Sequence, residues 1–75
     1  MPTLDELRPG QRGRVLSLQG DAALVQRLMD LGVIEEAEVE VIGFAPLGDP
    51  MEVRLGNARL SLRRHDAAGI EVHEL

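Results

Sequence analysis

The chain lacks cysteine, lysine, tryptophan and tyrosine, and Phe44 is its single aromatic residue. Without cysteine it can form neither a disulfide nor a thiolate metal site. With one aromatic side chain it can build neither a platform for stacking bases nor the aromatic groove that binds proline-rich peptides. These absences exclude base stacking and polyproline recognition.

The basic side chains are few, and the formal net charge is −5, with eight arginines as the only basic residues apart from two histidines. Nucleic-acid binding depends on basic side chains that neutralise phosphates, so we expect this acidic chain not to bind DNA or RNA. The N-terminus has no basic start followed by an apolar stretch, and no apolar run approaches the ~20 residues that span a bilayer. We therefore expect a cytoplasmic protein that is not embedded in the membrane.

The sequence also contains no recognisable arrangement of catalytic residues. Ser17 and Ser61 lie within predicted strands, and no base with an orienting group can be assembled around either. A nucleophile needs a base and a third group that orients the base. We expect a single domain over residues 1–75 that is not an enzyme.

One amphipathic helix is predicted over residues 22–31. Leu24, Leu28 and Leu31 follow the i, i+4, i+7 spacing of an inward-facing stripe. Asp21 is placed to cap the N-terminus, and a glycine follows at the position where a left-handed residue ends a helix.

The rest of the chain predicts a mainly β fold. Alternating apolar and polar residues predict five short strands, over residues 13–18, 38–44, 51–55, 58–62 and 70–72. In the first strand we expect Leu16 and Leu18 to share a face. Gly56-Asn57 predicts a two-residue hairpin turn, and charged residues on the outer face favour ion pairs across strands. Closure removes exposed strand edges, so we expect a small, partly open β-barrel with one helix after its first strand.

A six-residue loop between two of these strands combines rigidity with apolar side chains: Ala45, Pro46, Leu47, Gly48, Asp49 and Pro50. Its prolines fix φ, while Leu47 and the flanking Phe44 and Met51 are apolar. Exposed, these groups would form a docking element. The alternative is that Leu47 folds back to plug the core.

Metal ligands are sparse. His65 and His73 are the only imidazoles, and Glu71 lies on the same side of the last strand as His73. Imidazole and carboxylate together suit Fe²⁺ or Zn²⁺. These weak candidates fall short of the ligand number of a closed site, so we expect no tightly bound cofactor.

Two motifs resemble the ferrous iron transport protein A family: Leu24-x-x-Arg27-Leu28-x-Asp30-Leu31-Gly32, and Glu38-Val39-Glu40-Val41 followed by the loop 45–50. The similarity extends over essentially the whole chain. It implies an SH3-like barrel and a small cytosolic accessory of the bacterial ferrous iron permease, a membrane protein with a cytosolic G-protein domain. The family commonly has Pro-Gly where this chain has Glu35-Glu36, so the turn there is expected to differ.

The leading hypothesis is a non-enzymatic interaction module. Val25, Arg27 and Met29, together with the loop 45–50, would contact the permease at the cytoplasmic face of the membrane. The structural alternative is that Val25 and Met29 complete the core and Arg27 pairs with Asp30.

Three functional alternatives stay open. The barrel also resembles the C-terminal domain of metal-dependent repressors of the diphtheria toxin repressor type. A second reading is a metal-sensing or metal-carrying domain that uses the two histidines. A third is an activator that supplies Arg27 to a GTPase. The oligomeric state is not determined by the sequence.

Overall fold

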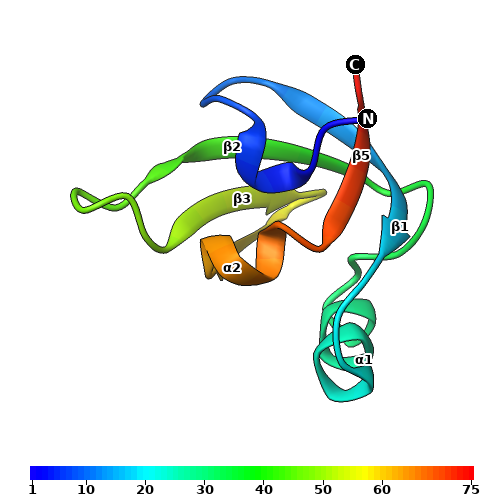
Figure 1. Ribbon diagram of the computed structural model, residues 1–75. Coiled ribbons are helices and arrows are strands. Elements are labelled where there is room, and N and C mark those ends of the chain that lie inside the picture. Colours follow the sequence, from blue (N-terminus) through cyan, green and yellow to red (C-terminus); the bar gives the residue numbers. More distant parts are fainter.

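The computed structural model describes residues 1–75 and consists of a curved sheet with short helices at its margins (Figure 1). In chain order the elements are η1 (Leu4–Glu6), β1 (Arg12–Leu18), α1 (Ala22–Asp30), β2 (Glu38–Phe44), β3 (Met51–Leu55), β4 (Ala58–Leu62), α2 (Arg64–Ala67) and β5 (Ile70–Glu74). The predicted mainly β fold, with one helix after the first strand, is confirmed.

The five strands form one antiparallel sheet in the order β4-β3-β2-β1-β5. The register shifts between Val15 and Ser17 in β1, and between Val41 and Gly43 in β2. Such bulges bend a strand and increase its twist, which lets a small sheet curl around its own core. The result is the partly open barrel that the strand pattern predicts.

The bulge in β1 also changes which side chains point inward. Val15 is fully buried, whereas Leu16 is only half-buried and Leu18 packs at the margin of the core. The prediction that Leu16 and Leu18 share a face is therefore wrong, since only Leu18 packs against the core. An extra residue in a strand breaks the period of two on which that prediction rests.

The core is entirely apolar, and every helix and strand contributes to it. Its buried members are Leu4, Leu7, Val15, Leu28, Val33, Val39, Val41, Met51, Val53, Leu62, Ala67, Ile70 and Val72. No polar or charged residue is buried. Stability in so small a domain therefore rests on this one cluster.

The ends of α1 follow the sequence signals, but its last turn does not. The Asp21 carboxylate accepts a hydrogen bond from the Leu24 N–H at 2.8 Å, as an N-cap does. At the other end, Gly32 has φ 99°, and the Val33 N–H donates to the Leu28 carbonyl at 2.9 Å.

This bond pattern is a Schellman motif, which turns the chain sharply after a helix. The turn places Val33 in the core, whereas Leu31 is 47% exposed. The prediction that Leu31 faces inward is therefore wrong, because the helix ends at Asp30 and the stripe does not continue.

The N-terminal segment covers the outer edge of β5. Thr3 forms a bridge with Glu71, and the Val72 N–H donates to the Pro2 carbonyl at 3.0 Å. The Glu6 carboxylate accepts from the Thr3 N–H at 2.8 Å, and this bond holds the pKa of Glu6 below its ordinary value. The segment thus shields one edge of the sheet from pairing with other chains.

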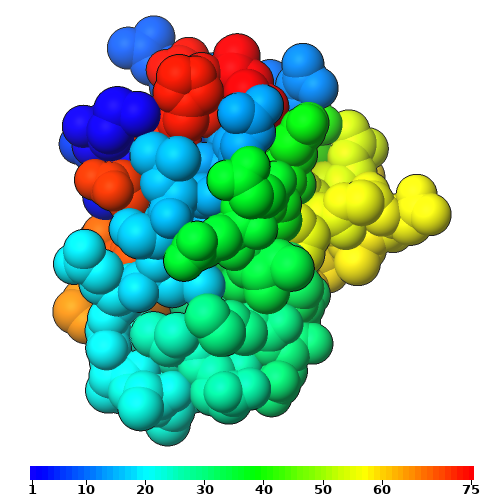
Figure 2. Space-filling view, turned by 90° about the vertical axis from the view of Figure 1, so that its right-hand side faces the viewer, coloured from blue at the N-terminus to red at the C-terminus, as the bar shows by residue number.

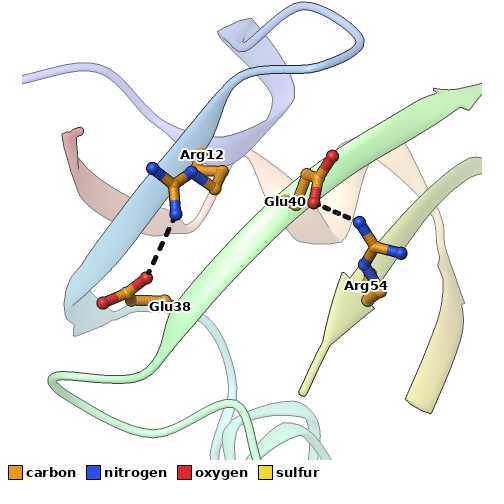
Figure 3. A network of polar contacts seen from close by, with 4 residues as sticks. All are labelled: Arg12, Glu38, Glu40 and Arg54. Atoms are coloured by element: carbon orange, nitrogen blue, oxygen red, sulfur yellow. Dashed lines mark hydrogen bonds and ion pairs between the residues drawn. The ribbon is translucent and has the colours of Figure 1, made fainter. Parts of the chain in front are cut away.

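The outer face of the sheet carries charges of both signs, several of them paired across neighbouring strands. Arg12 of β1 pairs with Glu38 of β2 at 3.8 Å, and Glu40 of β2 pairs with Arg54 of β3 at 2.5 Å (Figure 3). A further pair joins Glu52 and Arg59 across the β3–β4 hairpin at 3.7 Å. The expected cross-strand ion pairs are confirmed.

Candidate functional site

The loop 45–50 is held in place by the start of α2. The Asp49 carboxylate accepts a hydrogen bond from the Arg64 N–H at 2.9 Å and lies 3.7 Å from the Arg63 guanidinium. Within the loop, the Gly48 N–H donates to the Ala45 carbonyl at 2.7 Å. The loop is therefore fastened at its base and closed by a turn.

Leu47 lies at the tip of this loop and is 98% exposed. The reading in which it plugs the core is therefore wrong. Its neighbours Pro46 and Gly48 direct the chain outward, and the Asp49 anchor fixes the base. The structure thus presents one large apolar side chain to solvent on a fixed support.

The residues flanking the loop differ from the expectation that they share its exposure. Met51 is fully buried and belongs to the core. Phe44 is half-buried, and the Arg64 guanidinium lies over its ring, 4.9 Å from the centroid. Only Leu47 among the three apolar residues is free to contact a partner fully, because β2 and β3 carry the other two into the sheet.

The three helix residues of the predicted surface differ in accessibility. Met29 is 40% exposed, Val25 is half-buried, and Arg27 is exposed. Arg27 lies 3.9 Å from the Asp66 carboxylate of α2, whereas Asp30 accepts a hydrogen bond from Gln26. The expectation that Arg27 pairs with Asp30 is wrong, because a residue distant in sequence supplies the carboxylate.

The structure does not bring α1 and the loop into one continuous surface. Figure 1 places them at opposite ends of the view, with α2 between them. The single turn of α2 is joined to the loop through Arg64 and to α1 through Asp66. The predicted surface is therefore two separate patches connected by α2.

The metal candidates stay apart. His65 is exposed on α2, while Glu71 and His73 lie on β5. The Glu71 carboxylate already accepts a weak hydrogen bond from the Ser17 hydroxyl at 3.4 Å. No three imidazole or carboxylate side chains are arranged to hold a metal ion, so the donor set does not fit a closed site.

The sequence alone indicates no role for α2. The available signal was Arg63-Arg64 following a strand, with Asp49 as the acidic residue of the neighbouring loop. Nothing in their spacing of 15 positions predicts that the two segments meet. Register of β3 against β4 brings them together, and register is a property of the folded sheet.

No helix in the structure is long and apolar enough to cross a bilayer, since the longest, α1, has nine residues.

Known proteins are similar to this chain along nearly its whole length. A curated relative from Porphyromonas gingivalis, a fusion of Fe(2+) transport protein A with the Fe(2+) transporter FeoB, is 35% identical over 69 residues. That match covers 92% of this chain but only 8% of the fusion protein.

Two solved structures are also similar. The FeoA protein of Chlorobium tepidum is 46% identical with a TM-score of 0.93, covering 97% of this chain and 70% of that one. The zinc-complexed FeoA of Stenotrophomonas maltophilia, described as a prokaryotic SH3 domain protein, is 31% identical with a TM-score of 0.85, covering 97% and 91%. The SH3-like fold is thus confirmed.

The likeness to metal-dependent repressors is one of fold. A manganese-dependent transcriptional repressor is 20% identical with a TM-score of 0.90, and the match covers 99% of this chain and 41% of the repressor. The FeoA domain model matches residues 3–74. Because this match covers nearly the whole chain, the chain belongs to the FeoA domain family.

Proposed function

We propose that this chain is a non-enzymatic interaction module that supports ferrous iron uptake by binding the cytosolic part of a ferrous iron permease. The observation that carries the proposal is Leu47, which is almost wholly exposed at the tip of an anchored loop. An exposed leucine costs solvation free energy in the free protein, and a partner that covers it recovers that cost. A fixed loop also loses little conformational entropy on binding.

The FeoA–FeoB fusion supports the choice of partner. In the Porphyromonas gingivalis protein a domain 35% identical to this chain is joined covalently to the transporter. Two proteins that act together gain effective concentration when they are joined, so a fusion favours a physical association of the separate forms. We infer the same association for this chain, at the cytoplasmic face of the membrane.

The interface has two parts in this proposal. Leu47 and its loop form the main contact, and the exposed side of α1, with Arg27 and Met29, forms a second. The short helix α2 connects the two through the Asp49–Arg64 and Arg27–Asp66 contacts. Because Val25 is half-buried, we assign it to the support of this surface.

A binding measurement tests this proposal. The permease from the same organism, reconstituted in nanodiscs, is immobilised, and the purified chain is passed over it. We expect saturable binding that is absent from nanodiscs without permease. Lack of binding to the permease in all its nucleotide states would contradict the proposal.

A further inference from the structure

Two carboxylates differ from all the others in having no polar partner. Every aspartate and glutamate side chain except Glu35 and Glu36 accepts a hydrogen bond or faces an arginine in an ion pair. Both unpartnered side chains are exposed and lie in the turn between α1 and β2. Their charges are therefore available to an external group.

The backbone under this acidic pair is fixed and strained. Glu36 is the one residue other than glycine with a positive φ, at 76°. Its N–H donates to the Val15 carbonyl at 2.8 Å, and the Ala37 N–H donates to the Ile34 carbonyl at 3.1 Å. The turn thus holds a charged side chain in a conformation that glycine adopts without cost, and such strain is typical of functional positions.

Exposed apolar side chains adjoin the two glutamates. Leu31 is 47% and Ile34 is 49% exposed. Together with Ala37 and Leu55 they line a shallow hollow whose other members include Glu35, Glu36 and Glu38, with no basic residue. The hollow lies where the turn after α1 approaches the β3–β4 hairpin, which projects in yellow in Figure 2.

The charge at this hollow decides which partner fits. Glu38 is matched by Arg12 (Figure 3). The unmatched charge of the hollow therefore belongs to Glu35 and Glu36. A second copy seated symmetrically here would place the same carboxylates near each other, which is repulsive. An anionic membrane surface would repel them as well.

We propose that this hollow binds a basic amphipathic segment of a partner protein. Aliphatic side chains of the segment would pack on Leu31, Ile34 and Leu55, and its lysines or arginines would face Glu35 and Glu36. Helix-in-groove recognition uses this combination of an apolar face and flanking charge. The surface is distinct from the Leu47 loop and goes beyond the proposed function.

The test uses a synthetic amphipathic helix of leucine and lysine, titrated into the isotope-labelled chain and followed by NMR. We expect the largest shifts at Leu31, Ile34, Glu36 and Leu55. A peptide of the same composition in scrambled order, and a leucine–glutamate helix, should bind far more weakly. Shifts centred elsewhere, or equal binding of the scrambled peptide, would overturn the proposal.

Charge-matched variants separate this site from general attraction to an acidic protein. Glu35→Gln with Glu36→Gln should weaken binding about fivefold at low salt, as the loss of two exposed ion pairs does. Glu52→Gln with Glu74→Gln removes the same charge elsewhere and should change the affinity little. Equal weakening by the two double variants would contradict a specific site.

The other occupants give different results. Sedimentation would detect a dimer that forms with concentration and is lost on Ile34→Ser, and that dimer would assign the hollow to a second copy. Binding to vesicles containing anionic lipid, lost in the same variant, would assign it to a membrane. Either result overturns the proposal, whereas a monomer that ignores such vesicles supports it.

Discussion

Glu36 has a left-handed backbone, with φ at 76°, and a side chain without an intramolecular partner. A non-glycine residue in this region costs on the order of 1 kcal/mol, and this one gains no hydrogen bond from its carboxylate in return. Leu47 is also unfavourable in the free protein, because its apolar side chain is exposed to water and adds nothing to the core. Neither residue adds to the stability of the free protein, and in the two proposals above both serve the contact with a partner.

The strain at Glu36 gives a prediction on stability. Glu36→Gly should raise the free energy of unfolding by about 1 kcal/mol and the melting temperature by about 4–8 °C. Glu36→Gln keeps the strain and should leave the melting temperature nearly unchanged, so the pair of variants separates backbone from charge. A melting temperature for Glu36→Gly at or below that of the parent chain would contradict this account.

At the scale of elements, the strands and α1 follow from local periodicity, because each has one wet and one buried face. The errors lie where the period breaks. The bulge in β1 shifts Leu16 off the inward face, and the Schellman turn exposes Leu31 in favour of Val33.

The candidate site was less predictable than the fold. Composition and spacing indicate a rigid loop, but the exposure of Leu47 and the burial of Met51 depend on where β2 and β3 join the barrel. The link between Asp49 and Arg64 depends on the register of a sheet that forms only on folding. Sequence alone therefore identifies the loop but not its support.

The contact between the loop 45–50 and α2 can be removed by substituting Asp49. Asp49→Ala deletes the acceptor for the Arg64 N–H and the charge facing Arg63. We expect a loss of about 1 kcal/mol, as for other capping residues, and a melting temperature lower by about 4–8 °C. Amide exchange of Arg64 and Gly48 should accelerate together.

Asp49→Asn is the matched control, because it keeps the oxygen acceptor and removes the charge. It should retain most of the protection at Arg64. If Asp49→Ala left amide exchange in the loop unchanged, the loop would owe its conformation to its prolines rather than to α2.

Across the whole molecule, the barrel presents two exposed apolar features besides Met29 of α1 and the residues at the termini. The loop carries Leu47, and the hollow after α1 carries Leu31 and Ile34. The core of the barrel is small and wholly apolar, without buried polar side chains. The barrel acts in this account as a rigid support for surface contacts.

Metal binding is tested on the whole chain by calorimetry with Zn²⁺ or Fe²⁺, the latter without oxygen. His65, Glu71 and His73 lie on two elements and form no cluster, so we expect no tight stoichiometric site in dilute solution. Zinc is the first ion to titrate, because the similar FeoA of Stenotrophomonas maltophilia was solved in complex with it. A submicromolar site that disappears in the His65→Ala, His73→Ala double variant would contradict this expectation.

If Leu47 contacts the permease and contributes nothing to the core, Leu47→Asp should lose binding while the domain stays folded. Affinity for the reconstituted permease and thermal stability are measured on the same preparation, with Leu28→Asp as the control for a buried site. For Leu47→Asp we expect an affinity at least about tenfold lower, with stability within ~0.5 kcal/mol of the parent chain. Leu28→Asp should unfold the domain, because burying a carboxylate costs several kcal/mol. Unchanged affinity of a folded Leu47→Asp variant would contradict the account.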